Sequence, residues 1–285
     1  MPTAPPAVPP DSASPAVVQA AGALADATRT RTACDPVRVL FDDGDIESAY
    51  AVQRLNVRHG LAAGRRAVGR KIGLTSRAVQ SQLGVGQPDF GVLFADMEVP
   101  AGGVVPAGRL IQPKVEAEVA LVLGGDLPHP RCTVADVVRA TDVALPALEI
   151  VDSRVRGWDI SIVDTVADNA SCGLYVLGGD PLPLSDLDLP SVRMTMTRNN
   201  EVVSRGSGAD CLGSPLSAVA WLASTLAGLG DPLRAGDLVL TGALGPMTPA
   251  VPGDVFEAHI STLGSVRVGF ATEATETTDA EGEER

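Results

Sequence analysis

The stretch that decides the fold is Ile111-Gln-Pro-Lys-Val-Glu-Ala-Glu-Val-Ala-Leu-Val-Leu123. Charged and apolar residues alternate in its middle, which is the period of a β-strand. On such a strand Lys114, Glu116 and Glu118 share one face, and the aliphatic side chains at 115, 117, 119, 121 and 123 share the other. The two glutamates then project side by side, with their Cβ atoms about 6–7 Å apart.

Two carboxylates so close together are costly on a strand this apolar, which we expect to be at least half buried. Either one of them keeps its proton or a cation lies between them. Oxygen ligands favour a hard ion such as Mg²⁺ or Mn²⁺ over zinc. Glu149, in the apolar run Leu145-Pro-Ala-Leu-Glu-Ile-Val-Asp152, is a third candidate ligand. Pattern alone favours a blander interpretation, with Glu116 and Glu118 on a solvent-facing edge and Glu149 in an ordinary ion pair.

Outward from this stretch, further strand patterns occur at 116–123, 147–151, 191–197, 237–241, 255–260 and 265–270. Helical spacing of apolar residues predicts helices over 16–31, from Asp45 towards Gly60, and from Ser214 to Gly228. This order indicates a β-rich α+β fold and not a regular βαβ alternation. Phosphate-binding glycine motifs are absent from the sequence, so a nucleotide-binding fold has no support.

Composition narrows the class of protein. The chain has 285 residues and a formal net charge of −13, which argues against a nucleic-acid or anionic-membrane binder. It has no apolar run of about 18 residues for a membrane helix and no basic-then-apolar secretory leader. Four scattered cysteines without a CxxC pair are typical of reduced thiols in the cytoplasm, and three histidines show no zinc-enzyme spacing.

The two ends differ from the body. Residues 1–15 contain six prolines, and residues 271–285 carry six acids against one arginine. Both compositions predict disordered tails. Between them we expect a single domain over 16–270, with an N-terminal helical part over about 16–66.

A cationic stretch contrasts with the acidic balance of the chain. Residues 48–88 contain seven cations and no acid, which predicts attraction of an anionic small molecule or, as the simpler interpretation, a solvated helix face. Lys71 stands apart because Gly69-Arg-Lys-Ile-Gly-Leu74 sets it in a short apolar run. Partial desolvation there predicts a lowered pKa and a role in proton transfer.

Six segments in this order resemble the 2-keto-4-pentenoate hydratases, also called 2-hydroxypenta-2,4-dienoate hydratases, of the fumarylacetoacetate hydrolase superfamily. The resemblance runs from about residue 16 to residue 270. The segments are Gly69-Arg-Lys-Ile-Gly-Leu-Thr-Ser76, Gln87-Pro-Asp-Phe-Gly91, Glu116-Ala-Glu118, Glu149-Ile-Val-Asp-Ser-Arg154, Asp164-Thr-Val-Ala-Asp-Asn-Ala-Ser171 and Thr241-Gly-Ala-Leu-Gly-Pro-Met247.

The resemblance implies a mixed β-sheet roll with flanking helices and one divalent cation, Mg²⁺ or Mn²⁺. It implies Glu116, Glu118 and Glu149 as metal ligands, the acids that the strand pattern already singles out. It also implies Lys71 and Asp89 as the acid–base pair, although the residues around Asp89 by themselves predict only a turn.

The implied reaction is hydration of 2-hydroxypenta-2,4-dienoate to 4-hydroxy-2-oxopentanoate in aromatic catabolism. The cation would chelate the substrate's C1 carboxylate and C2 oxygen. Protonation at C5 would give an unsaturated ketone, to which water adds at C4. The resemblance also implies homo-oligomers, and a complex with a pathway decarboxylase is a further expectation. The composition predicts a cytoplasmic location and no nucleic-acid or membrane partner.

Other activities remain open at this point. The hydrolases of the superfamily carry a lysine in the segment that corresponds to 160–170, and this chain has none there. Decarboxylases of 2-oxohex-3-enedioate (4-oxalocrotonate) share most of the motifs, but Trp158 and the segment 241–247 look more like the hydratases. A lyase acting on another 2-oxo acid is a further alternative. A non-catalytic partner of a decarboxylase is disfavoured, because the whole acidic cluster is retained.

Small polar residues follow the third acidic segment. Thr165, Asn169 and Ser171 either bind the substrate or satisfy backbone groups at a turn, and the sequence does not separate these interpretations. Leu244 begins a stretch, to Met247, that we expect to close over the hydrocarbon end of the ligand. Cys172 is interpreted as a packing residue.

Overall fold

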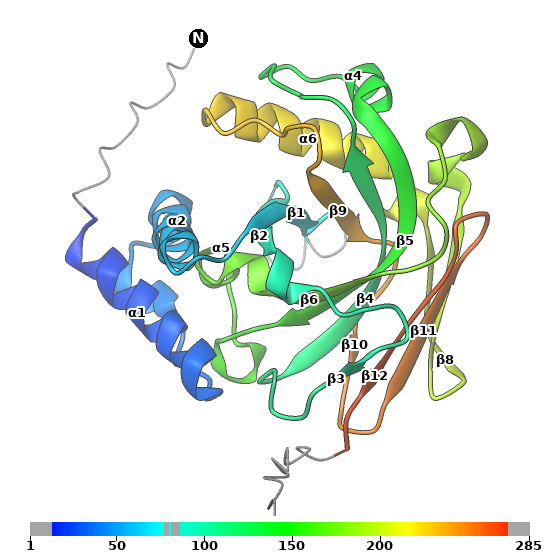
Figure 1. Ribbon diagram of the computed structural model, residues 1–285. Coiled ribbons are helices and arrows are strands. Elements are labelled where there is room, and N and C mark those ends of the chain that lie inside the picture. Colours follow the sequence, from blue (N-terminus) through cyan, green and yellow to red (C-terminus); the bar gives the residue numbers. More distant parts are fainter. Residues whose placement is uncertain (1–12, 77–79, 81–85, 273–285) are drawn as a thin grey trace, which may run out of the picture.

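The protein is described here by a computed structural model that covers residues 13–76, 80 and 86–272. Two curled β-sheets face one another, and helices lie at their outer sides (Figure 1). The predicted tails at 1–15 and 271–285 lie outside the described residues, apart from 13–15 and 271–272.

The larger sheet carries the acidic stretch near its centre. The strands of this sheet are ordered β2-β1-β9-β4-β5-β6, and β10 pairs with β4. Strands β1 and β9 are parallel, and every other described pair of neighbouring strands in this sheet is antiparallel. The strands are β1 (Ala67–Gly73), β2 (Asp89–Phe94), β4 (Pro113–Leu123), β5 (Thr141–Asp152), β6 (Cys172–Leu177), β9 (Leu238–Ala243) and β10 (Thr248–Pro249).

The second sheet covers β5 and β6. Its order is β3-β12-β11-β7-β8, and β11 and β12 contact β5. The apolar side chains between the sheets form one buried core, which includes Leu121, Leu148 and Phe256. The strands are β3 (Val104–Val105), β7 (Arg193–Arg198), β8 (Glu201–Ser207), β11 (Val255–Ile260) and β12 (Gly264–Phe270).

The helices form two groups. Helices α1 (Pro15–Thr30), α2 (Ile46–Ala62) and α5 (Ile162–Ala167) pack together around a smaller core of their own. Helices α4 (Val134–Ala140) and α6 (Pro215–Gly228) pack against each other, and α6 also packs on β9. The stretch Gly208–Gly228 is apolar enough to cross a membrane by composition. One apolar face of α6 is buried in the core, however, which explains that composition.

The α+β fold with a mixed sheet roll is confirmed. All six predicted strands and all three predicted helices are present, with ends shifted by a few residues. The sequence patterns missed β1, β2, β6, β8, α4 and α5. Glycines interrupt the apolar alternation of β1 and β2, and α4 and α5 are too short to show a helical period.

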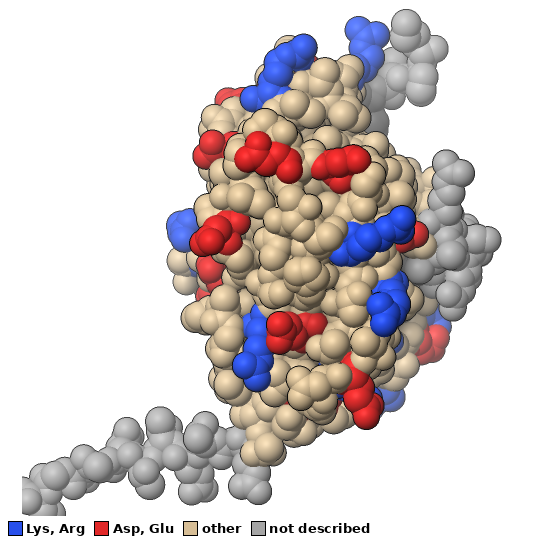
Figure 2. Space-filling view, turned by 90° about the vertical axis from the view of Figure 1, so that its right-hand side faces the viewer, with Lys and Arg blue, Asp and Glu red and all other residues tan. Residues whose placement is uncertain are grey.

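The side of the molecule where the second sheet lies, at the right of Figure 1, carries isolated acidic and basic side chains separated by uncharged surface (Figure 2). Neither charge gathers into a broad patch on that face. The cations of 48–88 likewise disperse: Arg65 pairs with Asp96 and Arg70 with Asp231, while Arg77 lies outside the described residues.

Candidate active site

Strand pairing brings the three predicted metal ligands together. Glu116 on β4 lies directly opposite Glu149 on β5, and Glu118 follows two residues along the same face of β4. One carboxylate oxygen from each residue lies within 4.8 Å of the other two. Glu118 and Glu149 are fully buried and Glu116 is partly exposed. Because β4 pairs with a strand on each side, the interpretation of Glu116 and Glu118 on a solvent-facing edge is wrong.

The cluster leaves carboxylate oxygens without protein partners. Oε2 of Glu118 accepts a hydrogen bond from the Gly242 backbone N–H at 2.8 Å. Within the described part of the chain, Oε1 of Glu118 and Oε2 of Glu149 are buried and accept no hydrogen bond. Buried polar atoms normally find a partner. The unpartnered oxygens of Glu118 and Glu149, together with the neighbouring Glu116 carboxylate, are the donor set that a hard divalent cation prefers, so the residues fit a metal site.

The three acids resist carrying their charges together in the metal-free protein. Burial, and then the like charge of Glu149, raise the pKa of Glu116 to about 7. The same two causes raise the pKa of Glu118 well above its ordinary value. Burial also raises the pKa of Glu149, although the neighbouring Lys71 partly offsets it. A divalent cation would remove this repulsion.

Lys71 on β1 reaches the same cluster. Its Nζ lies 3.1 Å from Oε1 of Glu149 and donates a hydrogen bond of 2.9 Å to the carbonyl of Ala170. The side chain is 3% exposed. The prediction of a lowered pKa is wrong: burial alone would lower the pKa of Lys71, but the charges of Glu149 and Asp89 outweigh it and raise that pKa.

Asp89 begins β2 and pairs in register with Gly73 on β1, so it is a strand residue and not the turn residue that its local sequence indicates. Its Oδ1 is buried and makes no hydrogen bond to any described residue. Burial raises the pKa of Asp89, and Lys71 partly offsets this. A Cβ at position 73 would lie 2.2 Å from Oδ1 of Asp89, so only glycine leaves room for this carboxylate.

The predicted substrate-binding residues lie in different surroundings. The hydroxyl oxygens of Thr165 and Ser171 are buried and 3.2 Å apart. The Asn169 amide donates to the Val92 carbonyl at 2.9 Å and accepts from the Val92 N–H at 2.8 Å. This bonding is the backbone satisfaction that the sequence left as an alternative for Asn169.

Leu244 is fully buried, and its N–H donates to the Ala117 carbonyl on β4. Met247, at the other end of that segment, is exposed. Cys172 is a buried free thiol, as expected for a packing residue, and its pKa is raised by burial and then by Glu149.

Sequence reasoning missed a second buried charged group. Arg154, just after β5, pairs with Asp168, just after α5, and both are almost completely buried. Both residues fall inside or beside segments that carry the family resemblance, and an arginine within the run Ile150 to Val155 was the available signal.

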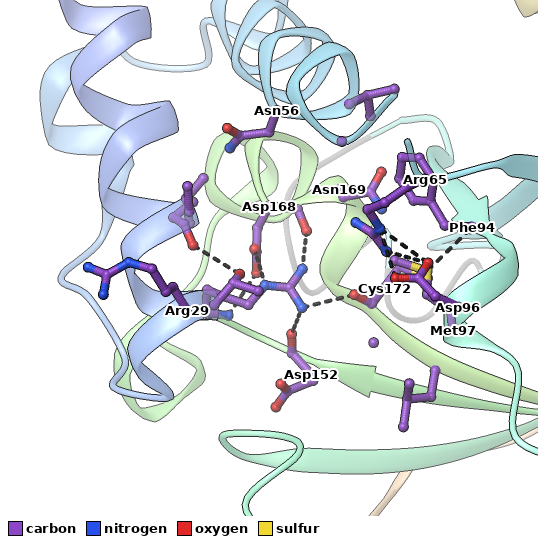
Figure 3. Close-up of a pocket in the computed structure, with 18 of the residues that line it drawn as sticks. Arg29, Asn56, Arg65, Phe94, Asp96, Met97, Asp152, Asp168, Asn169 and Cys172 are labelled. Carbon is purple, nitrogen blue, oxygen red and sulfur yellow. Dashed lines mark hydrogen bonds and ion pairs between the residues drawn. The ribbon is translucent and has the colours of Figure 1, made fainter. Parts of the chain in front are cut away.

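A cavity of about 620 Å³ lies beside this pair, between α1, α2 and the ends of β2, β5 and β6. Asp152, Asp168, Asn169 and Cys172 line it (Figure 3). None of the three clustered glutamates lines this cavity, nor do Lys71 and Asp89. We assign the chemistry to the carboxylate cluster and not to the cavity, because the unpartnered buried charges lie at the cluster.

The fold and this cluster define a known class of protein. Residues 64–271 match the fumarylacetoacetate (FAA) hydrolase C-terminal family, and the chain belongs to that family.

Within that family the chain is similar to hydratases. It is 60% identical over 252 residues to 2-keto-4-pentenoate hydratase 1 of Dechloromonas aromatica, covering 88% of this chain and 96% of the relative. It is 57% identical over 256 residues to the TodF product hydratase of Pseudomonas putida, covering 90% and 96%.

A solved structure gives a similar result for the fold. The 4-oxalocrotonate decarboxylase from Pseudomonas putida G7, complexed with magnesium and adipate, superposes with a TM-score of 0.86 at 38% identity. The match covers 89% of this chain and 97% of that one.

Proposed function

We propose that this protein is a metal-dependent hydro-lyase that hydrates 2-hydroxypenta-2,4-dienoate to 4-hydroxy-2-oxopentanoate. The observation that carries the proposal is the cluster of three glutamates, two of them with unpartnered buried oxygens, in a chain 60% identical to a 2-keto-4-pentenoate hydratase. Lys71 and Asp89 lie beside this cluster. The substrate is a small anionic 2-hydroxydienoate.

Glu116, Glu118 and Glu149 would hold Mg²⁺ or Mn²⁺. Such an ion, when bound, supplies Lewis-acid stabilisation of negative charge on a 2-oxo acid. The protein's part is to place three carboxylates on adjacent strands and to bury those of Glu118 and Glu149, so that water competes poorly for the site.

Lys71 and Asp89 would move the protons. The reaction removes the proton of the C2 hydroxyl, adds one at C5 and then adds water across C3 and C4. Burial raises the pKa of Asp89 and so favours the protonated carboxyl, and its unpartnered Oδ1 is free to give or take a proton. Nζ of Lys71, positioned by Glu149 and Ala170, is a donor for the oxygen that gains charge.

Decarboxylation of 4-oxalocrotonate is the second candidate. The specific observation in its favour is the TM-score of 0.86 to a 4-oxalocrotonate decarboxylase, although the identity of 38% is lower than that to the hydratases. A lyase acting on a related 2-oxo acid of another pathway would use the same residues.

One assay separates these activities. Purified protein is incubated with enzymatically generated 2-hydroxypentadienoate, with Mg²⁺ or Mn²⁺ and after EDTA treatment, and the ultraviolet absorbance of the dienoate is followed. Metal-dependent loss of absorbance with formation of 4-hydroxy-2-oxopentanoate supports hydration. Lack of turnover, together with release of CO₂ from 4-oxalocrotonate, would replace hydration by decarboxylation.

We also propose a cytoplasmic homo-oligomer that can associate with a pathway decarboxylase. The free thiols and the similarity to bacterial hydratases support the location. Light scattering measures the mass of the purified protein, alone and mixed with the decarboxylase. A monomeric mass that does not change when the decarboxylase is added would contradict the proposal.

A further inference from the structure

A strained turn lies between the acid–base pair and the cavity. Asn169, Ala170 and Ser171 follow one another with φ of 55°, 52° and 53°. The left-handed region costs an ordinary residue about 1–2 kcal/mol, so three such residues in a row persist only where the surrounding contacts hold them.

Arg154 binds the residues on either side of this turn. Its backbone N–H and Nε donate to the two carboxylate oxygens of Asp168, and Nη2 donates to the Asp168 carbonyl at 2.6 Å. Nη1 donates to the carbonyls of Cys172, at 2.9 Å, and of Asp152. One guanidinium therefore ties the end of β5 to the residues immediately before and after the turn. Its partners Asp152, Asp168 and Cys172 are labelled in Figure 3.

Residues 169–171 also contact β1 and β2, the strands that carry Lys71 and Asp89. The Ala170 carbonyl accepts the hydrogen bond from Nζ of Lys71 on β1. The Asn169 amide pairs with Val92 on β2, the strand that Asp89 begins. A Cβ at position 91 would lie 2.4 Å from the Asn169 carbonyl, so the close approach of turn and strand requires Gly91.

We propose that Arg154 is a positioning residue: it fixes the left-handed turn 169–171, and the Ala170 carbonyl then holds Nζ of Lys71 beside Glu149. The role rests on the proposed function, because the position of Lys71 matters through the proton transfer. Arg154 itself does not contact any of the three glutamates or Asp89 through a hydrogen bond or ion pair in the described residues.

The adjacent cavity makes the proposal testable by chemical rescue. Arg154 lines this cavity, so replacing it by alanine opens a hole that added guanidinium ion can enter. We expect Arg154→Ala to lower kcat about 100-fold, the cost of a misplaced catalytic group. KM for 2-hydroxypentadienoate and the affinity for Mg²⁺ should stay close to wild type. Guanidinium chloride, well below denaturing concentrations, should restore kcat, and sodium chloride should not.

Arg65→Ala is the matched control. Arg65 is another guanidinium on the wall of the same cavity, but it pairs with Asp96 and does not contact the turn. Its replacement should leave kcat unchanged, with or without guanidinium. If Arg154→Ala fails to fold, Arg154→Lys is measured instead, because lysine keeps the charge and loses the forked contacts.

A crystal structure of the folded Arg154 variant decides the geometry independently of activity. We expect residues 169–171 to relax and the Ala170 carbonyl to leave Nζ of Lys71. Retention of that contact, or a wild-type kcat in both Arg154→Ala and Arg154→Lys, would overturn the proposal. If wild-type protein does not turn over the dienoate, the proposed function fails, while the crystal structure still decides whether Arg154 holds Lys71.

Discussion

Two buried charged groups meet at Cys172, and they differ in how their charges are satisfied. The thiol lies beside Glu149 of the carboxylate cluster, and the Cys172 carbonyl accepts from Arg154. Around Arg154 the donors find carbonyls or the Asp168 carboxylate, whereas the glutamates keep buried oxygens without described partners. A satisfied network fixes the backbone, and an unsatisfied one is arranged to receive a ligand.

The largest effect should come from the lysine that belongs to the unsatisfied group. Lys71→Met removes a proton-transfer group, so we expect kcat to fall about 10³-fold, within the usual range for general acid–base catalysis. Mg²⁺ should still bind, as measured by isothermal titration calorimetry. Unchanged turnover would remove Lys71 from the mechanism.

Removing a proposed ligand should act on the metal before it acts on folding. Glu118→Gln keeps the shape of the side chain, and we expect Mg²⁺ affinity to fall about 100-fold or more, since even outer contacts of a metal site are worth 10–100-fold. The metal-free variant should be at least as stable as the metal-free wild type, because one buried repelling charge is gone. Full metal affinity in the calorimeter would contradict the ligand assignment.

Disrupting the buried Arg154–Asp168 pair should, by contrast, reduce the stability of the fold. Asp168→Asn leaves the buried Arg154 guanidinium uncompensated, and breaking such a pair costs about 3–5 kcal/mol in the free energy of unfolding. Urea denaturation of wild type and variant measures this loss. If Asp168→Asn and Glu118→Gln changed the stability of the metal-free protein alike, the contrast between the two groups would be lost.

The pH dependence of stability should also depend on the metal. In the metal-free fold the pKa of Glu116 is raised from 4.5 to about 7, so the folded state binds a proton that the unfolded chain has released. Stability of the metal-free protein should therefore fall as the pH rises through this interval. Excess Mg²⁺ should flatten or reverse the trend in thermal unfolding, and identical pH profiles with EDTA and with Mg²⁺ would count against a cation at these glutamates.

The smallest change in stability is expected from breaking an exposed ion pair. Arg65 and Asp96 form a forked ion pair with side chains 35% and 52% exposed, so Arg65→Ala should cost at most about 1 kcal/mol. The same urea denaturation measures it. A loss as large as that of Asp168→Asn would show that burial does not separate these pairs.

Strand alternation in residues 111–123 was enough to predict the central strand and the shared face of Glu116 and Glu118. The approach of Glu149 was not derivable from the residues, because it depends on the pairing register of two strands that places Glu149 opposite Glu116, 33 residues earlier (149 − 116). The family resemblance supplied that grouping and the pairing of Lys71 with Asp89. Neither route predicted the contacts of Arg154, since Asp168 and Cys172 lie 14 and 18 residues along the chain and only the tertiary structure brings them to its guanidinium.

The direct pairing of Glu116 with Glu149 across β4 and β5 has a consequence for folding. A slip of one residue would turn one strand's carboxylate to the opposite side of the sheet and split the trio. Only correctly aligned chains would then gain the binding energy of the ion, which is added to the stability of the native state alone. A bound cation would therefore stabilise the native pairing of β4 and β5 and would give no stability to a shifted pairing.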